Sequence, residues 1–166
     1  KRGWTDVMLV ERSELTSGST WHAAGGMHTI NGDPNMSHLQ AYTVKLYEEL
    51  ERESGQSCGV HRVGCLYLAG TEARAEYFKT ELAKAHYLGI GLHEVSMEEV
   101  KKINPLVDTS KFTKAMFDPA DGHVDPSSVT HAYAKAAKNK GATISLRNPV
   151  LELKQKPNGH WLFVTK

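Results

Sequence analysis

An acidic residue stands at the end of an apolar run near the start of the sequence. Residues 7–10 read VMLV, with no alternation of polar and apolar side chains, and Glu11 follows directly. A continuous apolar run is typical of a parallel strand that is buried on both faces. In dinucleotide-binding folds, an acid at the carboxyl end of such a strand hydrogen-bonds the adenosine ribose. Glu11 is therefore a candidate nucleotide-binding residue, although a solvated turn residue is the simpler interpretation of an acid at this place.

A loop rich in Ser, Gly and Thr follows this strand and runs into Trp21 and His22. Small side chains, hydroxyls and backbone N–H groups suit contact with phosphate. A flexible linker is the alternative, but an indole and an imidazole are poor linker residues. We therefore interpret residues 12–26 as a ligand-binding loop, and we predict that residues 16–30 form a loop with one short helical turn.

The glycine loop that accompanies such an acid should precede it by about 20 residues. Counting back from Glu11 passes the first residue, Lys1. The sequence also starts without Met and ends at Lys166 directly after a predicted hairpin strand. We therefore expect an internal piece of a longer protein.

Length and charge limit the class of protein. The 166 residues suit one domain or parts of two. Twenty Lys and Arg against 19 Asp and Glu give a net charge of +1, which argues against a strongly basic nucleic-acid binder. No apolar run approaches the ~20 residues of a membrane span. We expect neither a nucleic-acid partner nor a membrane partner.

The cysteines and histidines form no recognisable metal motif. Cys58 and Cys65 have the spacing of neither a disulfide framework nor a zinc site, and the nine histidines are scattered without an HExxH pair. We predict two reduced thiols, which fits a reducing compartment, and no metal site.

The remaining sequence predicts alternating helices and strands, and hence an α/β chain. Four helices are predicted from caps and apolar spacing: 34–54, 72–88, 97–103 and 126–140. Further strands are predicted at 60–69, 114–118, 143–146, 150–154 and 160–165, the last two joined by a hairpin turn. The inward stripe of the first helix is expected to include Met36 and Leu39, and that of the last to include Tyr133.

The loop sequence resembles one group of flavoenzymes. The resemblance is carried by LVER at residues 9–12 and by LTSGSTWHAAG at residues 15–25. It continues through LYEELE at 46–51, GCLYLA at 64–69 and DGHVDP at 121–126, and so covers nearly the whole chain. These motifs closely resemble the dimethylglycine and sarcosine dehydrogenase group of the D-amino-acid-oxidase-like superfamily of FAD enzymes.

The resemblance implies roles for particular residues. His22 matches the histidine that is bonded to the 8α carbon of the flavin, and Glu11 and Arg12 match the pair that contacts the adenosine. Val150 would hold the adenine through its main chain. The loop that would follow the flavin and pyrophosphate contains Gly18, Ser19, Thr20, Trp21, Ala23, Ala24, Gly25 and Gly26. These roles are chemically reasonable, because neutral imidazole is a nucleophile and small residues let the backbone approach a flat ring.

The implied fold is a partial Rossmann-like FAD-binding domain, without its first strand and glycine loop, joined to part of an α+β substrate domain. Residues 1–55 and 119–166 are assigned to the FAD-binding domain, and residues 56–118 to the substrate domain. No catalytic residue is assigned; His61 and His123 are the candidates, and packing or capping is the simpler role for both. Residues 27–35 differ from the animal enzymes and look more bacterial.

The implied activity is oxidative demethylation of dimethylglycine, an N-methyl amine. Electron-transfer flavoprotein is the implied acceptor, and tetrahydrofolate would bind in a C-terminal part beyond Lys166. The implied location is the bacterial cytoplasm, or the mitochondrial matrix of a eukaryote. The alternatives are a sarcosine dehydrogenase, a non-catalytic relative such as the regulatory subunit of pyruvate dehydrogenase phosphatase, and a plain ADP-binding module.

Overall fold

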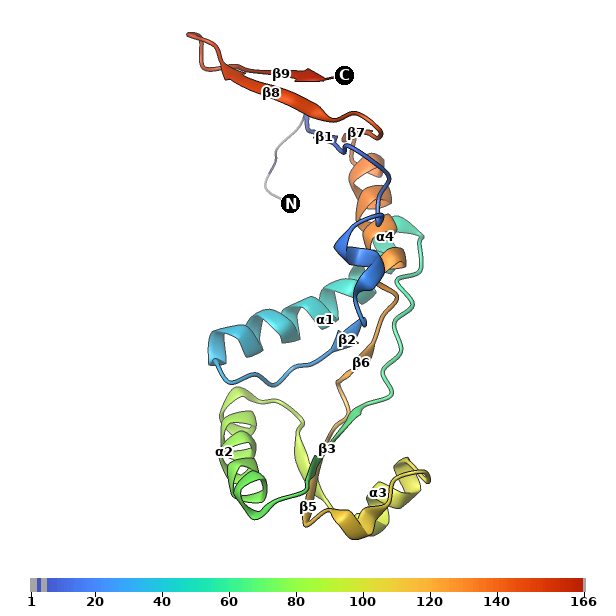
Figure 1. Cartoon of the computed structure of the whole chain (residues 1–166), viewed down its shortest axis with the longest axis vertical. Helices are drawn as coiled ribbons and strands as arrows, with labels where there is room; N and C mark the ends of the chain where they lie inside the picture. The colour runs from blue at the N-terminus through green and yellow to red at the C-terminus, as the bar shows by residue number, and fades with distance from the viewer. Residues whose placement is uncertain (1–2, 4–5, 166) are drawn as a thin grey trace. The chain divides into compact units, whose positions relative to one another are not determined.

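The computed structural model describes residue 3 and residues 6–165 (Figure 1). The chain divides into two compact units. The first combines residues 1–24, 48–59 and 125–166, and the second combines residues 25–47 and 60–124. These units are geometrical, so the assignment of FAD-binding and substrate domains stays a prediction.

The first unit contains a parallel pair of strands. β1 (Met8–Val10) pairs with β7 (Thr143–Ser145), with Leu9 opposite Ile144. The predicted parallel strand is therefore present, but the expectation that it is buried on both faces is wrong. The side chains of Met8 and Leu9 are 53% and 46% exposed. Among the described residues, β1 pairs with β7 alone, and a two-stranded ribbon cannot cover its own faces.

Helix α4 (Pro126–Asn139) leads into β7 and begins as its sequence predicts. The Asp125 side chain accepts hydrogen bonds from the backbone N–H groups of Ser127 and Ser128, and Pro126 occupies the first turn. Val129, Ala132 and Ala136 are buried, but Tyr133 is exposed, contrary to expectation. The buried stripe is narrow, following positions i, i+3 and i+7, and Tyr133 lies at its border.

The first unit also carries an antiparallel hairpin. β8 (Val150–Gln155) pairs with β9 (Trp161–Thr165), as predicted. Gly159 has φ +81° in the connecting turn, in the left-handed region that favours glycine. The large apolar side chains of both strands are exposed.

The second unit is built around a three-stranded antiparallel sheet in the order β3-β5-β4. β3 is Cys65–Ala69, β4 is His93–Val95 and β5 is Lys114–Asp118. Helices α2 (Glu72–Leu88) and α3 (Met97–Ile103) lie on opposite sides of these strands (Figure 1).

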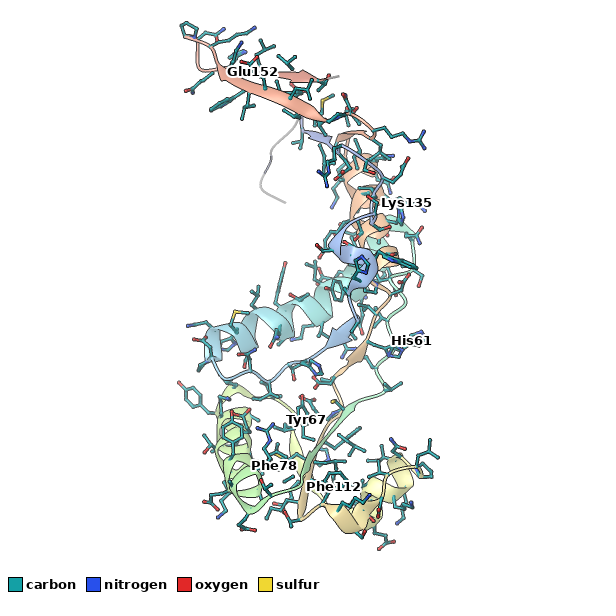
Figure 2. All side chains as sticks on the ribbon, viewed as in Figure 1. His61, Tyr67, Phe78, Phe112, Lys135 and Glu152 are labelled. Carbon is teal, nitrogen blue, oxygen red and sulfur yellow. The ribbon has the colours of Figure 1, made fainter. Side chains whose placement is uncertain are left out.

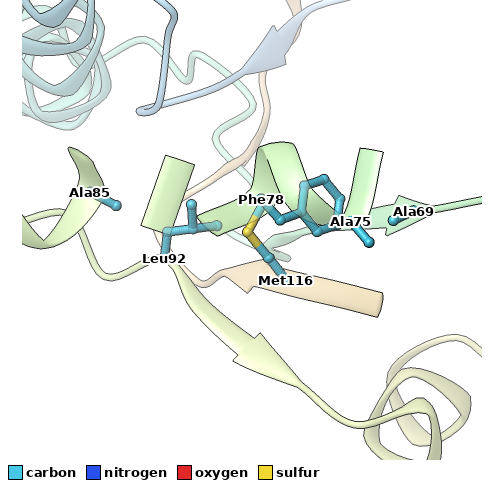
Figure 3. Packing of buried hydrophobic residues seen from close by; sticks show 6 residues of the cluster. All are labelled: Ala69, Ala75, Phe78, Ala85, Leu92 and Met116. Atoms are coloured by element: carbon cyan, nitrogen blue, oxygen red, sulfur yellow. The ribbon is translucent and has the colours of Figure 1, made fainter. Parts of the chain in front are cut away.

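Alternating side chains of the sheet divide between the two helices. Phe78 of α2 packs beside Met116 of β5 in one buried cluster (Figure 3). Ala115, the neighbour of Met116, packs instead with Val100 of α3 in another. The two-residue period of a strand therefore places one apolar set under each helix.

The caps of both helices agree with the sequence. The Thr71 hydroxyl accepts from the N–H of Arg74, and Gly89 closes α2 at φ +68°. Ser96 and Glu99 form a complete capping box at the start of α3, which ends before Asn104 as expected.

Helix α1 (Pro34–Ser54) contributes residues to both units. The Asp33 carboxylate accepts from the N–H groups of Asn35 and Met36, which confirms the predicted cap. The predicted stripe is partly wrong, because Met36 and Leu39 are exposed. Ser37 and Val44, seven residues apart on one face, are buried instead, and the Ser37 hydroxyl accepts from the N–H of Asn31.

Four short elements of the described structure were not predicted from the sequence, and β4 of the three-stranded sheet is one of them. β2 (Gly26–Met27) pairs antiparallel with β6 (Gly122–His123). A 3-10 helix, η2, covers Thr109–Lys111. The predicted α/β class is confirmed. A search of the described residues finds no helix with the length and the apolar character of a membrane span.

Candidate functional site

A cavity of about 690 Å³ lies in the first unit where β1 ends. It is lined by every residue from Glu11 to Thr20, with Thr130 of α4 closing one side. Five of the predicted cofactor-binding residues line this cavity: Glu11, Arg12, Gly18, Ser19 and Thr20. The lining is rich in hydroxyl and backbone groups, a composition that suits a polar, phosphate-bearing ligand.

Glu11 is held firmly at the end of β1. Its N–H donates to the carbonyl of Ser145 at 2.8 Å, and its own carbonyl accepts from the N–H of Asn148 at 2.9 Å. Carboxylate Oε1 accepts from the N–H of Ser13 at 2.8 Å. A carboxylate has about four acceptor positions, so Glu11 keeps the capacity to accept hydrogen bonds from a ligand's hydroxyls.

The loop after Glu11 is an ordered structure rather than a free linker. The Ser17 hydroxyl donates to the carbonyl of Glu14 at 2.8 Å, and the guanidinium of Arg147 pairs with the Glu14 carboxylate. Thr16 and Arg147 have φ of +70° and +54°. Positive φ costs energy for residues other than glycine and is concentrated at functional sites.

The 3-10 helix η1 (Ser19–His22) presents the two aromatic rings of the loop. The side chain of Trp21 is 72% exposed, and His22 is exposed beside it. Their rings meet edge-to-face with centroids 6.5 Å apart. The imidazole of His22 is therefore accessible for reaction with a bound molecule.

The other predicted cofactor residues do not line the cavity. Ala23 and Ala24 are exposed after η1. Gly25, at φ +77°, and Gly26 belong to the second unit. Val150 opens β8 opposite Thr165 and is half exposed. Roles for these residues stay predictions.

The two catalytic candidates lie together in the second unit. His61 and His123 exchange both backbone N–H···O bonds, at 2.8 and 3.0 Å, in an isolated antiparallel bridge. Their rings stack with centroids 4.9 Å apart, and both side chains are exposed. His61 is labelled in Figure 2. These two histidines are 62 positions apart in the sequence, and a spacing of that length does not predict that their backbones pair.

The second unit contains a buried polar cluster that was not predicted from the sequence. Asp118 and Asp121 are both 0% exposed, and Thr29 joins them. The Thr29 N–H donates to Asp121 Oδ1 at 2.8 Å, and its hydroxyl donates to Asp118 Oδ2 at 2.5 Å. The Tyr67 hydroxyl donates to Asp121 Oδ2 at 2.7 Å, and His28 Nδ1 lies 3.2 Å from the same oxygen. Tyr67 is labelled in Figure 2.

The pKa values of Tyr67 and of Cys65, which also lies beside Asp121, are both raised. Burial raises the pKa of Tyr67 above its ordinary value, and its hydrogen bond to Asp121 raises it further. Burial also raises the pKa of the Cys65 thiol, and the charge of Asp121 adds to that increase. The sequence signal for this cluster is a pair of acids three residues apart, Asp118 and Asp121, directly before Gly122.

Comparison with known proteins identifies the family. The model of the family "FAD dependent oxidoreductase" matches residues 1–166. Dimethylglycine dehydrogenase of Mus musculus is 38% identical over 161 residues, covering 97% of this chain and 18% of that protein. The Mus musculus pyruvate dehydrogenase phosphatase regulatory subunit is 33% identical, covering 92% and 17%. Homo sapiens sarcosine dehydrogenase is 31% identical, covering 90% and 16%.

A solved structure agrees with these matches. L-proline dehydrogenase from P. horikoshii superposes with a TM-score of 0.83 at 28% identity, covering 92% of this chain and 40% of that one. The chain spans less than a fifth of the length of the dimethylglycine dehydrogenases that it matches. Its sequence and its fold both place it in the family of FAD-dependent oxidoreductases, to which it belongs.

Proposed function

We propose that this chain is part of a flavin-linked amine dehydrogenase that demethylates dimethylglycine. The cavity at the end of β1 carries the proposal, because it brings Glu11 and Arg12 together with residues 18–20 of the predicted phosphate-binding loop. The similarity to dimethylglycine dehydrogenase, at 38% against 31% for sarcosine dehydrogenase, supports this substrate over sarcosine.

The cavity residues suit FAD by their donor and acceptor types. Glu11 supplies a fixed carboxylate for the ribose hydroxyls, and Arg12 supplies a positive charge. Hydroxyls and N–H groups from Gly18 to Thr20 suit the pyrophosphate. We assign to Val150 a main-chain contact with the adenine. FAD would supply hydride acceptance from the methyl carbon of the substrate.

We assign covalent attachment of the flavin to His22. His22 is exposed and lies two residues after the cavity-lining Thr20 in the same short helix. A neutral imidazole nitrogen is nucleophilic enough to bond the 8α carbon. Forming that bond would release one proton from the imidazole and one from the 8α methyl group, and it would leave two electrons on the flavin for its electron acceptor to remove. The exposed Trp21 ring offers a flat apolar surface beside that position.

The remaining parts of the proposal concern substrate and partners. Loss of hydride from an N-methyl group leaves an iminium, which water converts to formaldehyde or tetrahydrofolate captures. Electron-transfer flavoprotein would be the acceptor.

A non-catalytic regulatory relative or a plain ADP-binding module is the alternative, and the intact WHAAG around His22 favours the enzyme. A bound flavin absorbs near ~450 nm, whereas a module that binds only ADP does not.

The attachment is tested in the full-length protein by acid precipitation. Wild-type protein should carry its yellow colour into the pellet, and His22→Ala should release the flavin into the supernatant. His86→Ala, which removes an exposed histidine from α2, is the matched control and should behave as wild type. Recovery of all the flavin in the wild-type supernatant would show that the covalent assignment is wrong.

A further inference from the structure

The second unit brings three different metal-ligating side chains together. The ligand atoms of His28, Cys65 and Asp121 all lie within 4.8 Å of one another. We propose that these three residues bind a divalent transition-metal ion, with Zn²⁺ the best match. The inference is independent of the flavin chemistry proposed above, because it uses residues of the second unit alone.

The set of ligand atoms selects the class of metal. An imidazole nitrogen, a cysteine sulfur and a carboxylate oxygen are the three ligand types that Zn²⁺ uses in proteins. Mg²⁺ and Ca²⁺ prefer all-oxygen sites, so the thiol argues against them. Three protein ligands leave the fourth tetrahedral position for a water molecule.

The fold supplies the three ligands from separate segments. His28 directly follows β2, Cys65 opens β3, and Asp121 lies in the turn between β5 and β6. Asp121 is 0% exposed, whereas the His28 side chain is 49% exposed. The site therefore has one fixed buried ligand and one ligand that meets solvent, which gives an ion a route of entry.

Neighbouring groups already orient the buried ligand. The Thr29 N–H holds Asp121 Oδ1, which leaves Oδ2 directed toward His28 Nδ1 at 3.2 Å and the Tyr67 hydroxyl at 2.7 Å. Outer hydrogen bonds of this kind fix the direction of metal ligands in proteins. The Tyr67 hydroxyl already donates to Asp121 Oδ2, so it serves as an outer hydrogen-bond donor to this ligand.

The local charge also favours a cation. Asp118 and Asp121 are both fully buried and are bridged by Thr29. Buried carboxylates are costly unless hydrogen bonds and a positive partner compensate them. Asp118 and Asp121 accept hydrogen bonds from the hydroxyls of Thr29 and Tyr67 and from backbone N–H groups, and His28 Nδ1 lies beside Asp121. A divalent ion beside Asp121 would add a full positive charge to this pair of carboxylates.

Binding needs a small movement and a defined transfer of protons. Ligands of a tetrahedral zinc ion lie roughly 3.3–3.7 Å apart for the usual Zn–N, Zn–O and Zn–S lengths. The ligand atoms lie up to 4.8 Å apart, so displacements of about 1 Å at the side-chain ends would reach this spacing. The Cys65 thiol loses its proton to solvent on binding, so that a thiolate and a neutral imidazole bind the ion.

The test is metal loading of the full-length holoprotein. The protein is dialysed against Zn²⁺ and then against metal-free buffer, and bound zinc is counted per polypeptide chain. X-ray absorption at the zinc edge then reports the ligands, and one sulfur at about 2.3 Å is expected. Cys65→Ala should remove the sulfur signal and most of the bound zinc, and Tyr67→Phe should weaken binding by about tenfold.

Two controls separate this site from other zinc binding. Cys58→Ala removes the second cysteine, which is buried outside the cluster, and should keep both zinc and sulfur signal. The exposed pair of His61 and His123 would bind zinc without sulfur. Absence of zinc in the wild type, zinc without a sulfur ligand, or full retention by Cys65→Ala would each overturn the proposal.

Discussion

The backbone of Gly122 lies against the carbonyl of His61 so closely that a Cβ on Gly122 would sit 2.0 Å from that oxygen. The two backbones come this close where His61 and His123 exchange two hydrogen bonds. The glycine of the DGH sequence is therefore required by contact with another chain segment. Gly122 is the first residue of β6 and directly follows the buried Asp121, so the contact supports both features.

Replacing Gly122 by Ala should destabilise the protein markedly. The added Cβ cannot be accommodated by rotating a side chain, because its closest neighbour is backbone, and overpacking costs about 1–3 kcal/mol or more. Urea unfolding of the full-length protein measures this. Gly32→Ala is the matched control, since its Cβ would meet nothing within 4 Å. Equal unfolding free energies for the two variants would contradict the contact.

The stabilisation that Asp125 gives to the start of α4 should be lost at acid pH. The Ser128 hydroxyl, and then the N–H groups of Ser128 and Ser127, lower the pKa of its carboxyl. The unfolded state therefore binds the proton at higher pH than the folded state does. The stabilisation is fully present above the unfolded value of about 3.9 and is lost as the pH falls through the lower folded pKa.

Thermal unfolding at a series of pH values checks this expectation. Asp125→Asn should unfold at a lower temperature than wild type near neutral pH, and the difference should shrink as the pH falls below about 4. Ser128→Ala should show a smaller difference in the same direction. A wild-type advantage that grows on acidification would mean that the sign is wrong.

Residues 1–166 expressed alone should bind FAD weakly or not at all. Met8 and Leu9 in β1 are exposed, and β1 is the strand that carries Glu11 to the cavity. A strand with unpaired backbone groups and uncovered apolar side chains does not hold its end rigidly. Titration with FAD, followed by flavin fluorescence, tests this, with the full-length protein as reference. Tight binding by the isolated segment would overturn the expectation.

The substrate proposal predicts a particular pH dependence. Hydride leaves the methyl carbon only when the neighbouring nitrogen has a free lone pair, so the ammonium form must lose its proton. That pKa is near ~10 for a Lys-like amine in water, and burial beside a flavin would lower it. The rate of flavin reduction should therefore rise with pH through a pKa below the free value.

Anaerobic stopped-flow with a panel of substrates tests the same proposal. Dimethylglycine should reduce the flavin faster than sarcosine, and alcohols and D-amino acids should not reduce it. Fast reduction by a D-amino acid, with none by any N-methylglycine, would place the protein elsewhere in the superfamily.

Local signals in the sequence predicted most helix boundaries. Asp33, Thr71, Ser96 and Asp125 each begin a helix because their side chains accept from backbone N–H groups one turn ahead. The hairpin turn at residues 156–159 was equally local. The buried face of α1 was not predictable in the same way, because Ser37 is buried through its bond to Asn31 rather than through apolar character.

Features that depend on distant residues could not be read from one sequence. β2 and β6 have two residues each and carry no periodicity to detect. The cluster of His28, Cys65 and Asp121 spans 94 positions and has no motif spacing. By contrast, Glu11 and the loop to Thr20 are continuous in sequence, so a single cavity could be anticipated from their order.

The hairpin of β8 and β9 has a consequence for handling the protein. Trp161, Leu162, Phe163 and Val164 are consecutive and exposed, so both faces of β9 are apolar. Short, uncharged runs of aromatic and branched residues readily stack between molecules as steric zippers. Lys154 and Lys156 are the charged gatekeepers that oppose such stacking. A chaperone that binds exposed apolar strands would therefore bind this hairpin during synthesis. Dilute, low-salt buffers should keep the purified segment from associating.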